Sequence, residues 1–280
     1  MPIIARRLVR KMRGGAQAHL IEAEGGRFYV VKFVNNPQHR RILVNETVAS
    51  VLLDYLRISQ PETAVIELTP RFLGENPDVF IQLGTRRAPV PPGWHFGSRY
   101  PGDPNLTAVY DFIPDALLSR VVNFNEFLGM LVFDKWAANA DARQSIFFRA
   151  RIKEWSSGAP GQHAENGFLA QMVDHGYLFD GPHWDFCDSP LQGLYFRPLV
   201  YEHVRGWDDF EPWLSQVMDF PEEVLDDALK RVPRSWLDGD HEALERLLEK
   251  LLARRRRVPD LVRDTTRGRV NPFPKWSQTG

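Results

Sequence analysis

A strand hairpin near the N-terminus carries a lysine inside an apolar run. Residues 18–23 read AHLIEA and residues 27–34 read RFYVVKFV, and the Glu-Gly-Gly between them is typical of a tight turn between antiparallel strands. On a strand, Lys32 shares its face with Val30 and Val34. A lysine in such a place is unfavourable unless an acid pairs with it or its ammonium reaches water. The chain therefore has to give this lysine a partner or leave it at an edge.

The acid that can pair with this lysine lies on the next predicted element. Apolar residues recur at helical spacing over 40–57, which predicts a helix there. Between Glu24 and Asp54 the only acid is Glu46, inside this helix but off its main apolar stripe. Two interpretations stay open. Glu46 is a solvated helix charge, or it is the ion-pair partner of Lys32, reached from a helix packed beside the strand.

The pattern changes along the chain from strands to helices. Residues 64–83 and 106–114 are strand-like. Residues 84–105 hold five prolines and four glycines, which predicts a long loop. An apolar periodic run over 115–138 predicts a long helix. We therefore expect a strand-rich part and a helical part that meet near residue 112.

The C-terminal part is predicted to be mostly helical, with one hairpin inside it. The runs SIFFRARI and NGFLAQMV predict two strands around a polar loop at 153–166. The clearest helix begins after Asp240 as its N-cap and carries a leucine stripe that ends in the arginines 254–257. At the end of an amphipathic helix, such arginines are expected to be solvated rather than to bind nucleic acid. The polar tail at 261–280 is expected to be irregular.

Composition limits the class of protein. Basic and acidic residues nearly cancel, 35 against 36, so no global positive field favours nucleic acid or a membrane surface. The one cysteine, Cys187, excludes an internal disulfide and a multi-cysteine zinc site. No apolar run approaches the roughly 18–20 residues of a membrane span, and the N-terminus lacks the core of a signal peptide. We expect a cytoplasmic globular protein with no membrane span and no nucleic-acid partner.

A polar seam separates the long predicted helix from the strand that follows it. Residues 133–148 read FDKWAANADARQSIFF, with acids, amides and two cations between apolar elements. Asp141 could accept a proton from a hydroxyl or orient a nucleophile. Asn139 and Gln144 could bind a metal or fix the loop. Helix capping and loop hydrogen bonds explain the same residue types, so both interpretations stay open.

Two further features could touch a ligand. The turn RGGAQAH contains Gly14 and Gly15 between two strands, so its backbone can approach a ligand closely, although a plain hairpin turn gives the same pattern. It lacks the Gly-Lys-Ser/Thr ending of a Walker motif. Asp174 ends an apolar strand and is followed by His175 and Gly176. A carboxylate there can hold Mg²⁺ or simply close a turn.

In their order along the chain, these features resemble a HipA-like kinase, a bacterial branch of the protein-kinase-like fold, over roughly 10–260. GGAQAHL is similar to the family's Gly-x-Gln-x-Lys-Leu loop, YVVKF to its nucleotide-binding lysine and NETVAS to its partner glutamate. NADARQ is similar to the catalytic loop, and VDHG to the metal-binding Asp-Phe-Gly position. The resemblance implies a two-lobed α+β fold. The N-lobe, 1–112, would hold an antiparallel sheet and one helix, and the C-lobe, 113–280, would be mostly helical.

The resemblance also implies the activity of a serine/threonine protein kinase, with ATP and Mg²⁺ as cofactors. Lys32 would hold the α and β phosphates, oriented by Glu46. Asp141 would be the catalytic aspartate and Asp174 the magnesium ligand. The phosphoacceptor would be an unknown protein or small molecule. Adenine would lie between the lobes near 109–112, and the remaining implied nucleotide contacts are Gly14, Gly15, Gln17, Tyr110 and Phe112.

Three departures from the family pattern matter. Ile146 stands where the family usually has a second metal-binding asparagine, so Gln144 or Asn139 would have to substitute. The glycine turn at 12–20 has no serine or threonine, so it cannot be the self-phosphorylated site of HipA toxins. At 280 residues, the chain is expected to lack the extra N-terminal subdomain of the full-length toxins, and a toxin role is not assumed.

Three alternative functions stay open. The missing asparagine allows an inactive nucleotide binder that acts by interaction. The fold is shared with phosphoinositide kinases, which allows a small-molecule or lipid acceptor. A metal-dependent hydrolase is the third, because the segment DHGYLFDGPHWDFCD is rich in possible metal ligands, although their spacing matches no zinc motif. These possible ligands are His175, His183, Asp174, Asp180, Asp185 and Asp188.

Overall fold

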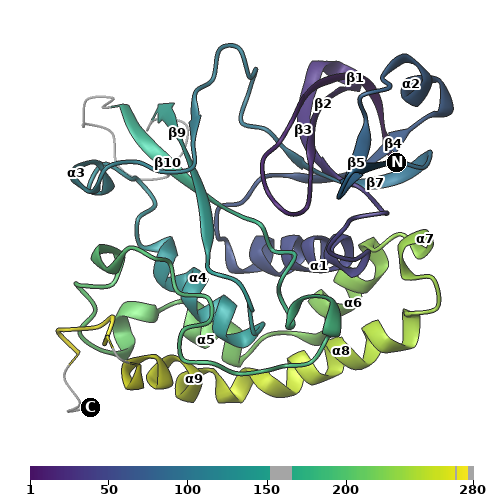
Figure 1. Ribbon diagram of the computed structural model, residues 1–280. Helices are drawn as coiled ribbons and strands as arrows, with labels where there is room; N and C mark the ends of the chain where they lie inside the picture. Colours follow the sequence, from purple (N-terminus) through teal and green to yellow (C-terminus); the bar gives the residue numbers. More distant parts are fainter. Residues whose placement is uncertain (152–165, 269, 277–280) are drawn as a thin grey trace.

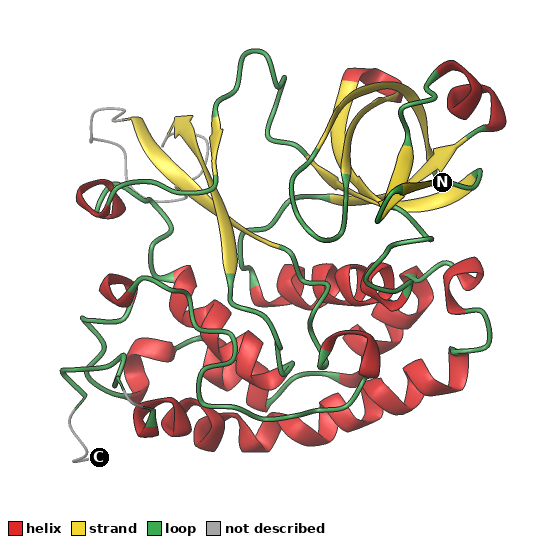
Figure 2. Ribbon diagram, in the orientation of Figure 1, coloured by secondary structure: helices red, strands yellow, loops and turns green. Residues whose placement is uncertain are grey.

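The N-terminal strands close into a small barrel. The computed structural model describes residues 1–151, 166–268 and 270–276. The barrel has the strand order β1-β2-β3-β7-β4, and it closes where β1 pairs in parallel with β4 through Ile3 and Ile66. The predicted antiparallel sheet is therefore a barrel with one parallel contact (Figures 1 and 2). Its strands are β1 (Ile3–Lys11), β2 (His19–Ala23), β3 (Arg27–Lys32), β4 (Thr63–Leu68) and β7 (Gly93–Arg99).

The prediction of a long loop at 84–105 is wrong. This segment holds β6 (Arg86–Pro89), which pairs with β5 (Phe80–Leu83), and then β7, which lies between β3 and β4. Its glycines had suggested a loop, but Gly97 is a packing residue, because a side chain there would come within 2.5 Å of Ile66 Cγ1. His95 is buried on the same strand and accepts a hydrogen bond from the Val34 N–H at 3.1 Å. Burial lowers the pKa of His95 to about 4, so it is neutral.

Helix α1 (Arg41–Leu56) lies between the barrel and the C-terminal helices (Figure 1). All of its residues are buried except Arg41, Asp54 and Tyr55. Its apolar side chains share one core with those of the helical part, although α1 precedes residue 112. Because the helix is covered on every side, the polar groups on it must find partners inside the protein.

A second, smaller sheet joins the two parts. Its order is β10-β9-β8, with β8 (Val109–Tyr110), β9 (Gln144–Arg151) and β10 (Asn166–Val173). The two long strands are those predicted from the sequence, whereas the predicted strand at 106–114 is reduced to two residues. The loop predicted at 153–166 lies, except for its last residue, outside the described residues. The register pairs Gln144 with Val173, so the start of β9 lies beside the end of β10.

The long helix predicted at 115–138 is interrupted. Between its two helical pieces the chain pairs with β10, since the Asn123 side chain exchanges hydrogen bonds with the backbone of Ala170 at 2.8 and 2.9 Å. Val121 and Phe168 form an isolated bridge nearby. These contacts give the backbone an alternative to helix. The helices that follow α1 are α2 (Pro70–Glu75), α3 (Asp115–Leu118), α4 (Glu126–Trp136), α5 (Trp213–Met218), α6 (Glu222–Arg231), α7 (Arg234–Leu237), α8 (His241–Arg254) and α9 (Val258–Asp264).

Two details of the C-terminal helices differ from the prediction. Asp240 occupies the N-cap position of α8 as predicted, but its carboxylate makes no capping hydrogen bond and instead accepts two from Arg41, at 2.8 and 2.6 Å. The expected irregular tail begins later than residue 261, because α9 continues to Asp264. Within the described ranges, no helix combines the length and the apolar character needed to cross a bilayer.

Candidate active site

A cavity of about 330 Å³ opens between the barrel and the β9–β10 hairpin. The glycine turn between β1 and β2 forms one wall together with residues of β3 and β7, and the adjacent ends of β9 and β10 form the other. Most residues predicted for the site line it. These are Gly14, Gly15, Lys32, Glu46, Asp141, Gln144 and Asp174. Four predicted residues do not line it, namely Gln17, Tyr110, Phe112 and Asn139.

The ammonium of Lys32 is held between two carboxylates. It extends from the last residue of β3 and donates to Glu46 Oε1 and, at 2.8 Å, to Asp174 Oδ1. Glu46 is only 4% exposed, whereas the Asp174 side chain is 37% exposed. Of the two interpretations of Glu46, the structure shows the ion pair. The lysine is fixed in place, because moving it away would leave a buried charge unpaired.

Burial and charge act in opposite directions on these three groups. Burial by itself would lower the pKa of Lys32, but the carboxylates of Glu46 and Asp174 outweigh it and raise that pKa, so Lys32 stays charged. The charge of Lys32 lowers the pKa of Asp174 against the effect of burial, so Asp174 is ionised. Burial raises the pKa of Glu46, while the adjacent ammonium and the His175 N–H favour its ionised form. We assign one positive and two negative charges to the cluster.

The loop that carries Asp174 is fastened to helix α1. Asp174 has a left-handed backbone conformation, with φ of 61°. The next peptide N–H, that of His175, donates to Glu46 Oε1 at 3.1 Å. Gly176 follows in close contact with α1, since a side chain there would come within 2.5 Å of Ile42 Cγ2. Glu46 therefore orients both the lysine and the loop that presents Asp174.

Arg143 connects this loop to the polar seam after α4. Its Nε donates to Asp134 Oδ2 at 2.8 Å, and its Nη1 donates to Val173 O at 2.8 Å and to His175 Nδ1 at 3.1 Å. Because Nδ1 of His175 accepts a hydrogen bond, that ring is neutral, and burial lowers the pKa of His175 well below its usual value. A satisfied buried network of this kind holds its members in a single arrangement.

The structure gives Asn139 a positioning role instead of a place at the cavity. Its side chain is fully buried, its Nδ2 donates to Asp134 Oδ1 at 3.1 Å, and its Oδ1 accepts from the Asp141 N–H at 3.1 Å. Both ends of the amide are used inside the protein, so the expectation that Asn139 binds metal is not supported. Asp141 itself is exposed, lines the cavity and accepts a hydrogen bond from the Ala142 N–H at 2.7 Å.

The register of β9 explains the position of Ile146. Gln144 pairs with Val173, directly before Asp174, whereas Ile146 pairs with Gln171, two residues further along the hairpin. A hydrogen bond from the Gln144 amide helps to lower the pKa of Asp174. The amide beside Asp174 is thus supplied by Gln144, and Ile146 adds an apolar contact to the cavity wall.

Comparison with known proteins identifies the family of the chain. A model of the HipA-like kinase family matches residues 4–147, more than half of the chain. The chain belongs to the HipA-like kinase family. No curated protein matches it.

Solved structures show the fold of this HipA-like kinase. It is similar to a crystal structure of the Golgi casein kinase, with a TM-score of 0.50, 13% identity and coverage of 97% of this chain and 74% of the other. A crystal structure of the Golgi casein kinase with Mn/ADP bound aligns with a TM-score of 0.47 and 12% identity, covering 92% of this chain and 72% of the other. At such identities the likeness concerns the fold, which is protein-kinase-like as the resemblance implied.

Gln17 of this HipA-like kinase holds the glycine turn in place from outside the cavity. Its Nε2 donates to Gln82 O at 2.8 Å and its Oε1 accepts from the Gln82 N–H at 2.7 Å, so the side chain pairs with the edge of β5. The amide of Gln17 is fully used on β5, so the structure does not support the expectation that Gln17 touches the nucleotide. The sequence motif had marked the turn correctly but not the direction of this side chain.

The structure does not support the expected nucleotide contacts of Tyr110 and Phe112 either, because neither residue lines the cavity. Val109 and Asp111 line the cavity, so the alternation along this short segment turns the side chains between and after them away from it. Tyr110 packs against Phe168, and Phe112 lies under the guanidinium of Arg197.

The structure does not support the metal site that a hydrolase would need. Among the described residues, no group of three or more His, Cys, Asp and Glu side chains could hold a metal ion. His175 points inward to Arg143 and Met172 O, and Asp188 is bound by arginines. The histidines and aspartates of residues 174–188 are close in the sequence, but the fold does not bring three of them together as metal ligands.

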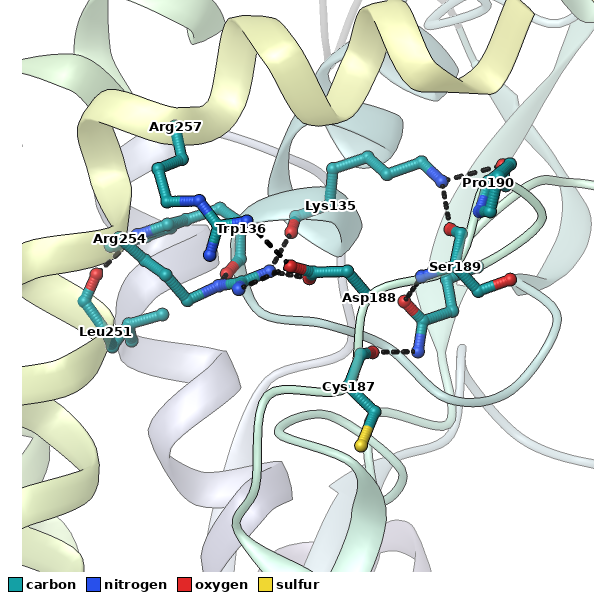
Figure 3. Close-up of polar contacts among 10 residues, drawn as sticks. Lys135, Trp136, Cys187, Asp188, Ser189, Pro190, Leu251, Arg254 and Arg257 are labelled. Carbon is teal, nitrogen blue, oxygen red and sulfur yellow. Dashed lines mark hydrogen bonds and ion pairs between the residues drawn. The ribbon is translucent and has the colours of Figure 1, made fainter. Parts of the chain in front are cut away.

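Arg254 is the main residue that the sequence did not reveal. Its guanidinium is only 5% exposed, and it donates to Trp136 O at 2.9 Å, to Lys135 O at 3.1 Å and to the Asp188 carboxylate (Figure 3). Trp136 is the last residue of α4, just before the seam that carries Asp141. The Lys135 ammonium donates in turn to Ser189 O and Pro190 O at 2.9 and 2.8 Å (Figure 3). The prediction of solvated arginines is therefore wrong for Arg254.

Arg254→Lys should destabilise the fold far more than Arg257→Ala. A lysine cannot make the forked contacts of Arg254, so it leaves buried carbonyls without donors, at a cost of about 2–4 kcal/mol. Arg257 binds the same Asp188 but its side chain is 59% exposed, so its loss should cost less than about 0.5 kcal/mol. The free energy of unfolding in urea measures both. Equal effects of the two variants would contradict the role of Arg254.

Proposed function

We propose that this HipA-like kinase transfers the terminal phosphoryl group of ATP to an acceptor hydroxyl, with Mg²⁺ bound. The observation that carries the proposal is the Lys32 ammonium, fixed between Glu46 and Asp174 in a cavity that also contains the exposed Asp141. A fixed cation, a free carboxylate and a glycine turn are the parts that phosphoryl transfer requires, because this chemistry depends on positioning and charge. We propose the lobes meet near residue 112.

The residues present fit a magnesium ion. The cluster of Lys32, Glu46 and Asp174 carries one more negative than positive charge, and Asp174 is its more exposed carboxylate. Mg²⁺ in phosphotransferases is held by one or two protein oxygens, with phosphate and water completing its shell. Asp174 and the amide of Gln144 would hold the ion. When bound, it would neutralise charge on the phosphates.

Each residue of the cavity would have a separate role in phosphoryl transfer. Lys32 would hold the α and β phosphates by charge and hydrogen bonds, and Glu46 keeps it there. Asp141 would orient the acceptor hydroxyl and accept its proton, since its carboxylate faces the cavity on a backbone fixed by Asn139. Gly14 and Gly15 allow the turn to approach the phosphates closely. Val109 and Asp111 would contact the base or ribose.

The acceptor we propose is a serine or threonine of another protein, in the cytoplasm. Ile146 favours a second candidate, an inactive nucleotide binder, because this residue brings no oxygen to the cavity. The amide of Gln144 beside Asp174 favours the active enzyme. Phosphoryl transfer to an acceptor distinguishes the active enzyme from the inactive binder.

The test is incubation of the protein with γ-labelled ATP, Mg²⁺ and a cell lysate, with Asp174→Ala as the control. Label on a lysate protein, absent from the control, is the expected result. Label on a small molecule would replace the protein acceptor by a metabolite or lipid. ATP binding with no label on any acceptor would contradict transfer and support the inactive binder.

A further inference from the structure

Gln38 lies in the loop between β3 and α1 and reaches the glycine turn. It lines the same cavity as Lys32 and Asp174. A side chain added at Gly15 would come within 2.9 Å of Gln38 Nε2, so the amide nitrogen lies against this glycine. The contact joins the turn that precedes β2 to the loop that follows β3. Neither the glycine motif nor the lysine strand predicts it.

The loop beneath Gln38 is held by hydrogen bonds of its own. The Gln38 N–H donates to Asn36 Oδ1 at 2.9 Å, and the buried Asn36 also receives the His39 N–H on its carbonyl at 3.1 Å. Asn35 Nδ2 donates to Pro89 O at 3.0 Å, which fastens the loop to the end of β6. The backbone that carries Gln38 is thus fixed before any ligand binds, which reduces the entropy lost on binding.

The Gln38 carboxamide has no hydrogen-bond partner among the residues that the structure describes. It is half-buried, so it is not an orphaned core group, and it lines the same cavity as the glycine turn and the Lys32 cluster, with its Nε2 beside Gly15. In the proposed function, that space contains the phosphates. A neutral amide donor there can bind a phosphate oxygen without adding charge to the lysine and metal already present.

We propose that Gln38 donates a hydrogen bond to the terminal phosphate of a bound nucleoside triphosphate. The inference rests on the proposed function and adds to it a residue that distinguishes a triphosphate from a diphosphate. Lys32 would hold the inner phosphates, which both nucleotides share. Gln38 would contact the group that only the triphosphate has. A side chain at Gly15 would displace the amide of Gln38 from this position.

The experiment is calorimetric titration with a non-hydrolysable ATP analogue and with ADP, each with Mg²⁺. Gln38→Ala should weaken binding of the analogue about tenfold, the loss of one hydrogen bond to a charged group, and change ADP binding less than about twofold. Gln38→Glu should weaken binding of the analogue further by repulsion. Gly15→Ala should also weaken binding of the analogue, and adding Gln38→Ala to it should cost less than Gln38→Ala costs in the wild type, because the alanine already displaces the same amide.

Asn35→Ala is the matched control, since it alters the same loop but contacts Pro89 outside the cavity. It should leave the ratio of the two affinities unchanged. Equal weakening of the analogue and ADP in Gln38→Ala, or no weakening of either, would overturn the inference while the wild type still binds both nucleotides. A wild type that binds neither nucleotide would overturn the proposed function and this inference with it.

Discussion

Asp141→Asn should lower the rate of phosphoryl transfer by about 10²–10⁴-fold. Asparagine has nearly the same shape, but it cannot accept the proton of the acceptor hydroxyl and it lacks the charge that orients that hydroxyl. Nucleotide affinity should change little, because in the proposed function the phosphates are held by Lys32 and Asp174 and not by Asp141. Steady-state kcat and a separate nucleotide titration measure the two effects independently.

The exposed position of Asp141 makes this a clean substitution. Among the described residues, its carboxylate accepts a hydrogen bond only from the neighbouring Ala142 N–H, so the fold should tolerate an amide there. Asn139→Ala is the informative comparison, since Asn139 holds the backbone of Asp141 without reaching the cavity. It should lower kcat less than Asp141→Asn and leave nucleotide affinity intact. Persistence of full turnover in Asp141→Asn would make Asp141 a structural residue and contradict the assignment.

Lys32→Met should abolish the rise in melting temperature that ATP and Mg²⁺ give the wild type. In the proposed function, the variant loses the cation that binds the inner phosphates, and it would leave Glu46 and Asp174 facing them as uncompensated carboxylates. We expect the loss of affinity to exceed about 100-fold, the size typical of removing one member of a buried charge pair. Each variant is compared with its own melting temperature in the absence of nucleotide.

Glu46→Gln keeps this prediction testable if the methionine variant folds poorly. Glutamine retains the shape of Glu46 and one oxygen for the Lys32 ammonium and the His175 N–H, but it removes the charge that fixes the lysine. Nucleotide affinity should fall to an intermediate value. Undiminished stabilisation by ATP in both variants would show that Lys32 does not contact phosphate.

The family and the two-part fold could be predicted because they depend on order along the chain. Strand alternation, helical spacing and the sequence of short polar motifs are local patterns, and they identified β2, β3, α1 and the β9–β10 hairpin. The two possibilities for Glu46 could not be resolved from sequence, because the side of α1 that faces the barrel depends on packing on every face of that helix.

The errors arose where tertiary contacts outweigh local composition. The prolines and glycines of 84–105 suggested a loop, yet Gly97 makes room for Ile66 inside the barrel. Tyr110 and Phe112 were expected on the face of their segment that turns out to point away from the cavity. Arg254 was predicted to be a surface arginine, because its acceptors, the carbonyl of Trp136 and the carboxylate of Asp188, lie far from it in the sequence.

A crystal structure of the protein with Mg²⁺ and a non-hydrolysable ATP analogue tests the central claim most directly. The account predicts a triphosphate under the glycine turn, with its inner phosphates on Lys32, a metal ion on Asp174 and the terminal phosphate facing Asp141. A nucleotide bound elsewhere, or a triphosphate that leaves Lys32 and Asp174 without contact, would contradict it.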